Sequence, residues 1–100
     1  LFRPPYGDMN AAVIEQVPLT VVRWNIDPED WHPKKKQYLL EHMAAYAKPG
    51  GVVVMHDTEA TTAERLEPLL TQLEAANYNF VTVSELLNVA PAQQGVYFNR

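Results

Sequence analysis

Short apolar runs alternate along the chain with longer stretches in which apolar residues recur every three or four positions. The short runs are rich in β-branched and aromatic residues, and they predict strands that end at residue 2 and cover residues 19–24, 52–55 and 80–83. The run at 52–55 lies between a Gly-Gly pair and a polar His-Asp-Thr segment. It is too short for a helix, and its unbroken apolar character is typical of a strand that is covered on both faces.

The periodic stretches between these runs predict helices. Asn10 can cap a first helix that ends near residue 17. The second predicted helix covers residues 34–47, and its apolar face consists of Leu39, Met43, Tyr46 and Ala47. Residues 25–33, which precede this helix, are predicted to form a loop.

Thr61 or Thr62 can cap a third helix, in which Pro68 either causes a kink or marks the first turn. The predicted core stripe of this helix consists of Leu66, Leu69, Leu70, Leu73 and Ala76. A short fourth helix is predicted to start at Ser84. After it we expect an irregular tail, with residues 96–98 packing back onto the domain.

The order of these elements predicts an α/β fold. Strands alternate with helices, as they do in the βα units of a barrel or an open parallel sheet. Both faces of a parallel sheet must be covered, and three or four such units make only part of a sheet. The chain also starts inside a predicted strand, with no polar lead-in before Leu1. We therefore expect residues 1–100 to be the C-terminal portion of a larger α/β domain.

Composition and charge narrow the classes of function. The 100 residues are 47% hydrophobic and 20% charged, which is typical of one globular domain at most. A net charge of −4 and a pI of about 5.2 argue against nucleic acid as a partner, because such a partner requires a concentrated basic face. The basic run at residues 34–36 fits a solvated helical turn better. No segment has the roughly 20 apolar residues of a membrane span, and cysteine is absent.

Candidate chemistry gathers just beyond three of the apolar runs. The segments are Arg-Pro-Pro-Tyr-Gly at residues 3–7, Asp-Pro-Glu-Asp-Trp at 27–31 and His-Asp at 56–57. Each falls where a predicted strand ends and a loop begins. Loops that a rigid scaffold holds in place are where catalytic groups collect. The pattern therefore indicates the rim of an active site.

His56 and Asp30 are the candidates for acid–base chemistry. Hydrolysis of an amide or ester needs a proton at the departing atom, and histidine exchanges a proton near neutral pH. A nearby carboxylate such as Asp30 would stabilise the protonated imidazole. The alternatives are a histidine held by structural hydrogen bonds at a strand end, and an aspartate that caps the next helix. Asp27 or Glu29 could also serve as that cap, although Asp27 is expected to form a local turn with Pro28.

Together the three segments resemble the third, fourth and fifth motifs of the polysaccharide deacetylase family, carbohydrate esterase family 4, also called the NodB-homology domain. The resemblance continues to residues 80–86 and so covers nearly the whole chain. It implies the C-terminal part of a distorted (β/α) barrel that is incomplete without an N-terminal portion. It also implies an enzyme that removes acetyl groups from sugar chains with a divalent metal, usually zinc or cobalt.

The resemblance gives roles to the motif residues. His56 would be the general acid, and Asp30 would tune it. Arg3 would hold a base aspartate that this chain lacks, unless it is an ordinary surface arginine. The backbone N–H of Tyr6 would bind the oxyanion of the tetrahedral intermediate, although the phenol of Tyr6 could simply pack.

Two further residues would contact the substrate. Trp31 would stack on a sugar ring or wall the acetyl pocket, although a tryptophan is more often a core residue. Val54 would line this pocket at a position where many relatives have leucine. Trp24, inside a predicted strand, is expected in the core.

The resemblance also implies that the metal ligands lie elsewhere. The family takes them from an Asp-Asp motif and a His-x-x-x-His motif, and neither occurs here. The histidines His32, His42 and His56 do not have that spacing. The chain should therefore supply the acid and the substrate groove. The metal side would come from the N-terminal portion of the same domain, either in the same polypeptide or as a separate chain.

The expected function is deacetylation of an acetylated polysaccharide, above all of N-acetylglucosamine residues in peptidoglycan or chitin-like oligosaccharides. The resemblance implies an extracellular or cell-surface location. An acetylxylan esterase would need the same groups and is the closest alternative. A non-catalytic fragment or sugar-binding remnant is the alternative of another class. A companion chain or upstream sequence with the missing motifs would favour the enzyme.

Overall fold

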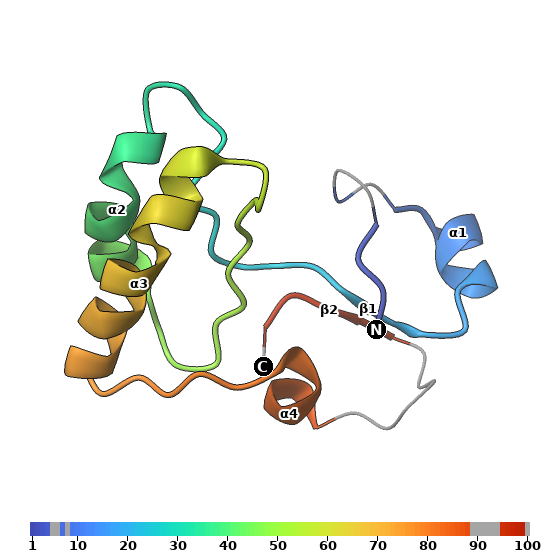
Figure 1. Cartoon of the computed structure of the whole chain (residues 1–100). Helices are drawn as coiled ribbons and strands as arrows, with labels where there is room; N and C mark the ends of the chain where they lie inside the picture. Colours follow the sequence, from blue (N-terminus) through green and yellow to red (C-terminus); the bar gives the residue numbers. More distant parts are fainter. Residues whose placement is uncertain (5–6, 8, 89–94, 100) are drawn as a thin grey trace. The chain divides into compact units, whose positions relative to one another are not determined.

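The structure is a computed structural model that describes residues 1–4, 7, 9–88 and 95–99 (Figure 1). Its elements in chain order are α1 (Ala11–Gln16), β1 (Thr20–Val22), the 3-10 helix η2 (Lys36–Tyr38), α2 (Leu39–Tyr46), α3 (Ala60–Ala75), α4 (Val83–Leu87) and β2 (Gly95–Tyr97). Strands and helices are mixed, as the sequence predicted, but the described residues do not form a barrel. None of the helices in the described part is long and apolar enough to cross a membrane.

The chain divides into two compact units. The first unit comprises residues 1–25, 50–52 and 81–100, and the second comprises residues 26–49 and 53–80. Each unit therefore combines segments that lie far apart in the sequence. The candidate residues of the segments at 27–31 and 56–57 fall in the second unit. The residues of the segment at 3–7 fall in the first unit.

A small parallel sheet forms the centre of the first unit. β1 pairs with β2 in the register Thr20 to Gly95, Val21 to Val96 and Val22 to Tyr97. Phe2 also forms a parallel bridge with Val21, and its backbone N–H donates to the Thr20 carbonyl at 2.8 Å. All three β1 residues are buried. The predicted strands at residues 2 and 19–24 are thus present in shortened form. β2 was not predicted as a strand, but residues 96–98 were expected to pack back.

The helices of the first unit are short and capped by side chains. The Asn10 side chain accepts a hydrogen bond from the Val13 N–H at 2.9 Å, which confirms the predicted cap of α1. Thr82 accepts from the Glu85 N–H at 3.3 Å and thereby caps α4. The predicted strand at 80–83 is wrong, because this cap draws Val83 into α4 and no strand is formed at residues 80–82.

Two packed helices form the core of the second unit. Figure 1 shows α2 beside α3, and their shared apolar cluster consists of Ile26, Leu39, Met43 and Leu69. Val53 packs against this cluster and forms a parallel bridge with Ile26. The Val54 N–H donates to the Ile26 carbonyl at 3.1 Å. The predicted strand at 52–55 is therefore reduced to a single bridge in this chain.

The predicted helix at 34–47 is only partly correct. Its α-helical part begins at Leu39, after the 3-10 turn. Leu39 and Met43 are buried as predicted, but Tyr46 is 62% exposed. Within the second unit α2 packs mainly against α3, which buries a narrow stripe rather than a wide face.

The predictions for α3 also need correction. Of the predicted stripe only Leu69 is buried and Leu73 packs beside it, while the remaining members Leu66, Leu70 and Ala76 are exposed. The N-cap is Glu59, so neither Thr61 nor Thr62 caps the helix. Pro68 lies inside the helix and not in its first turn.

Candidate active site

The pairing of two extended segments positions the candidate acid and its carboxylate. Residues 26 and 53 form a parallel bridge, so the chain leaves both segments at the same edge. Asp30 follows the first segment and His56 follows the second. The side chain of Asp30 is fully buried, whereas the side chain of His56 is 39% exposed. A buried carboxylate thus backs a histidine that solvent can reach.

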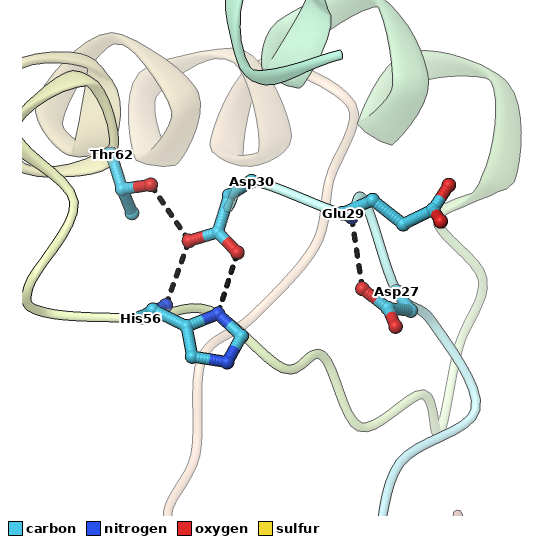
Figure 2. Close-up of polar contacts among 5 residues, drawn as sticks. All are labelled: Asp27, Glu29, Asp30, His56 and Thr62. Carbon is cyan, nitrogen blue, oxygen red and sulfur yellow. Dashed lines mark hydrogen bonds and ion pairs between the residues drawn. The ribbon is translucent and has the colours of Figure 1, made fainter. Parts of the chain in front are cut away.

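Asp30 accepts three hydrogen bonds, which Figure 2 shows together. Its Oδ1 lies 2.7 Å from Nδ1 of the His56 ring. Its Oδ2 accepts from the backbone N–H of His56 at 2.7 Å and from the Thr62 hydroxyl at 2.7 Å. Distances this short are typical of hydrogen bonds to a charged acceptor. The carboxylate is therefore satisfied on both oxygens despite its burial.

The charge state of Asp30 follows from these contacts. Burial raises the pKa of Asp30, but the hydrogen bonds from the His56 ring, the His56 N–H and the Thr62 hydroxyl lower it further than burial raises it. The net pKa of this carboxyl lies below its ordinary value, so Asp30 is ionised at neutral pH. An ionised carboxylate can only accept hydrogen bonds. The Nδ1 atom of His56 must therefore carry a proton.

The second ring nitrogen of His56 is left for other chemistry. Figure 2 shows Nε2 pointing away from Asp30, with no hydrogen bond drawn to it. With a proton fixed on Nδ1, gain or loss of a proton at the imidazole takes place at Nε2. This arrangement suits a general acid or base whose ring orientation is held from behind by a carboxylate.

Protonation of Asp30 at low pH should weaken its hydrogen bonds and lower the stability of the fold. Because the pKa of Asp30 is lower in the folded chain, its ionisation stabilises the fold above the unfolded-state value of about 3.9, and this stability is lost as the pH falls through the folded-state pKa. We expect the free energy of unfolding to decrease as the pH falls below about 4. Urea unfolding of the complete domain at several pH values should show a weaker acid dependence in Asp30→Asn.

Glu29→Gln is the matched control for this titration. A hydrogen bond from Lys35 lowers the pKa of Glu29, but the pair lies at the surface. Exposed ion pairs contribute little to stability. An acid dependence that is equal in wild type and Asp30→Asn would contradict the buried-carboxylate explanation.

The other carboxylates of the loop have local roles. Asp27 Oδ1 accepts from the backbone N–H of Glu29 at 2.8 Å, which confirms the predicted turn around Pro28 (Figure 2). Glu29 adopts a left-handed backbone with φ of 52° and pairs with Lys35. All three hydrogen bonds of Asp30 go to His56 and Thr62. The alternative that Asp30 merely caps the next helix is therefore wrong for the described residues.

The two tryptophans differ in how far their side chains are exposed. Trp31 is 50% exposed, and its ring contacts that of His32 with centroids 5.6 Å apart. The alternative of a core position for Trp31 is therefore wrong. Trp24 is half-buried and lies against the turn that ends at Gly7, where a Cβ would come within 2.6 Å of Trp24 Cη2. The expectation of a core position for Trp24 holds only in part.

Gly7 is the last residue of the Arg-Pro-Pro-Tyr-Gly segment. It has φ of 72°, and its N–H donates to the Pro4 carbonyl at 2.9 Å, so glycine permits the turn as expected. Arg3 is exposed in the first unit. Tyr6 lies outside the described residues. The roles that the resemblance gives to Arg3 and Tyr6 stay predictions.

Val54 is buried, with 4% of its surface exposed. Its neighbours Val53 and Met55 pack against the α2–α3 cluster, of which Val54 is not a member. Successive side chains of an extended segment point to opposite faces. Val54 therefore faces away from that cluster, on the same side as His56 two residues later.

The metal that the resemblance implies does not fit this chain by itself. Among the described residues no three His, Cys, Asp or Glu side chains come together as a metal-binding group. Asp30 and His56 instead bind each other.

Thr62 is the site residue that sequence reasoning missed. It was predicted only as a possible helix cap, yet its side chain is buried and its hydroxyl donates to Asp30. Its place in the first turn of a helix that starts four residues after His56 is the one local signal in the sequence.

The chain is similar to peptidoglycan deacetylases. It is 40% identical over 84 residues to the peptidoglycan-N-acetylglucosamine deacetylase PgdA of Listeria monocytogenes, covering 84% of this chain and 18% of that protein. It is 34% identical over 89 residues to the peptidoglycan-N-acetylmuramic acid deacetylase PdaC of Bacillus subtilis, covering 89% of this chain and 19% of that protein. The chain thus spans less than a fifth of either relative. No protein-family model matches it.

Solved structures show the same similarity. A structure described as T48 deacetylase with substrate superposes with a TM-score of 0.82 at 32% identity, over 95% of this chain and 48% of the other. The structure of PdaC from Bacillus subtilis gives a TM-score of 0.79 at 32% identity, over 86% of this chain and 43% of the other. In both cases this chain corresponds to less than half of the solved chain.

Proposed function

The chain belongs to the polysaccharide deacetylase family, carbohydrate esterase family 4, and we propose that it is the C-terminal portion of a catalytic domain that deacetylates a polysaccharide. One observation carries this proposal. The buried, ionised Asp30 holds His56 by Nδ1, the ring is partly exposed, and Nε2 has no hydrogen bond among the described residues. This is the geometry that a general acid requires, since the ring is fixed but its outer nitrogen is accessible.

In the proposed reaction His56 serves the leaving group. As the C–N bond of the acetamide breaks, Nε2 of the imidazolium gives its proton to the departing nitrogen. The imidazole that remains is neutral and keeps the proton on Nδ1, which still donates to Asp30. The carboxylate stabilises the imidazolium before the transfer. The oxygen that completes the acetate would come from water, which adds to the acetyl carbonyl and whose proton the base outside this chain would take. The products are a free amine on the sugar and acetate.

The other half of the reaction is proposed to lie outside this chain. The metal and the base aspartate that the family resemblance implies have no ligand group among the described residues. We assign both to the N-terminal portion of the same domain. Arg3 and Tyr6 keep the roles that the resemblance gives them, as partner of the base and as oxyanion donor.

The proposed substrate is the N-acetylglucosamine of peptidoglycan or of a chitin-like chain, reached outside the cell or at its surface. PgdA, which is named for peptidoglycan N-acetylglucosamine, supports this sugar. PdaC, which is named for peptidoglycan N-acetylmuramic acid, supports peptidoglycan as the polymer but not the sugar. Exposed Trp31 offers a flat apolar face to a sugar ring. Val54, buried on the His56 side of its segment, would wall the acetyl pocket.

A reconstituted domain tests the proposal. The chain is produced together with an N-terminal portion that carries the Asp-Asp and His-x-x-x-His motifs, and acetate release is measured with N-acetylglucosamine oligomers and with acetylxylan. We expect release from the amino sugar when the domain is metal-loaded. Faster release from acetylxylan would make the protein an esterase. Binding of the oligomers without any release would instead indicate a sugar-binding remnant.

Trp31→Ala should lower kcat/KM for oligosaccharides about 5- to 10-fold, as expected for a lost stacking contact of about 1–1.5 kcal/mol. Because Trp31 is half exposed, the melting temperature of the Trp31→Ala variant should differ little from that of the wild type. Trp24→Ala is the control, and it should destabilise the protein more because that ring packs against Gly7. Severe destabilisation by Trp31→Ala with unchanged kinetics would show that Trp31 packs and does not bind sugar.

A further inference from the structure

Thr62 lies outside the three motifs, in the first turn of α3. Only 6% of it is exposed, and its hydroxyl donates to Asp30 Oδ2 at 2.7 Å. We propose that Thr62 is a positioning residue for proton transfer, which holds the Asp30 carboxylate in the orientation that directs Nε2 of His56 toward the substrate. This inference rests on the proposed general-acid role of His56.

The geometry of the carboxylate gives Thr62 this importance. Rotation of an aspartate carboxyl group about its last bond is only weakly restricted. Oδ1 binds the His56 ring, and Oδ2 binds the His56 backbone N–H (Figure 2). Both of these contacts belong to the residue that is to be oriented. Thr62 supplies the one hydrogen bond to Asp30 from an independent element in the described chain.

That element is itself fixed. Leu69, on the same helix as Thr62, is buried in the cluster with Leu39 and Met43. A threonine in a helix can satisfy its hydroxyl locally, on a carbonyl three or four residues earlier. Thr62 instead donates across 32 positions of sequence to Asp30. The hydroxyl therefore ties the Asp30–His56 pair to the packed helices.

Three substitutions in the complete domain test this role. Thr62→Val replaces the hydroxyl by a methyl group, Thr62→Ser retains it, and Thr61→Val makes the same exchange at the neighbouring position, which has no hydrogen bond to Asp30 among the described residues. We expect Thr62→Val to lower kcat about 10-fold or more with KM unchanged, because a displaced acid costs rate. Thr62→Ser and Thr61→Val should behave as wild type.

Nitrogen-15 NMR of the His56 ring provides a second measurement that does not need turnover. In wild type and Thr62→Ser the neutral ring should carry its proton on Nδ1, since that atom donates to Asp30. In Thr62→Val a fraction of the Nε2–H tautomer should appear. Thr62→Ala, which also lacks the hydroxyl, serves if the valine variant fails to fold.

Two outcomes separate the possible failures. If hydroxyl-free variants keep the wild-type kcat and ring spectrum and change only the melting temperature, Thr62 is purely structural and the inference is overturned. If the wild-type domain releases no acetate from any substrate but the tautomer still shifts, the proposed function fails while the positioning by Thr62 stands.

Discussion

His56→Ala in the complete domain is expected to lower turnover about 100-fold or more, the usual loss when a general acid is removed. The ring nitrogen that faces Asp30 is already committed, so proton delivery depends on Nε2. Alanine has no group that could replace it, and the leaving nitrogen would depart unprotonated. The rate of acetate release at saturating substrate measures this effect.

The metal content of the same variant distinguishes two roles for His56. Because His56 is assigned as an acid, His56→Ala should retain the full metal content of the wild type. His42→Ala is the matched control, since His42 stacks on Tyr46 within α2 and should leave turnover near the wild-type value. Loss of metal from His56→Ala would make His56 a ligand and would contradict the proposed role.

Predictions that rest on local chemistry succeed where the signal and the structure lie within a few residues. The cap of α1 is an example, because Asn10 bonds to a backbone N–H only three positions away. The turn at Asp27 is another, with its hydrogen bond to Glu29. In both cases the energy that decides the conformation is contained in the short segment itself.

Predictions that depend on a neighbouring element fail more often. The apolar run at 80–83 has the composition of a strand, but a strand needs a partner, and the capping hydrogen bonds of Thr82 with Glu85 favour a helix there. Likewise, periodicity marks Leu66 and Leu70 as core positions. Which part of a stripe is buried depends on the neighbours of the helix, and α2 covers only the part around Leu69.

In the candidate site, too, residues marked by a local motif were predicted, and a residue whose role depends on a distant partner was not. The motif resemblance selected Asp30 and His56, and the structure brings them to 2.7 Å across 26 positions of sequence. Thr62 was missed because a threonine at the start of a helix is ordinarily interpreted as a cap. The acceptor of its hydroxyl becomes visible only when the loop after Ile26 and the start of α3 are placed together.

Asp30→Asn is expected to lower turnover at neutral pH about 10-fold or more. An amide has no charge with which to stabilise the imidazolium that delivers the proton. The amide also presents N–H donors on one side. If that side faces Nδ1 of His56, the ring must accept there, and the neutral ring then carries its proton on Nε2.

The opposite orientation of the amide is no better tolerated. Its NH2 group would then face the His56 backbone N–H and the Thr62 hydroxyl, both of which donate to Oδ2 in the wild type. A buried donor opposite a backbone N–H costs about 1–3 kcal/mol. With the NH2 group toward Nδ1 the variant loses the wild-type tautomer of the His56 ring. With the NH2 group toward the backbone N–H it loses part of its stability.

Asp27→Asn is the matched control for this last prediction. Asp27 lies in the same loop, but its Oδ1 accepts the turn hydrogen bond from the Glu29 N–H, which an asparagine oxygen can also accept. Its turnover should equal that of the wild type. If Asp30→Asn also turns over as fast as the wild type, the carboxylate does not assist the acid, and the three hydrogen bonds of Asp30 serve only to hold the loop against α3.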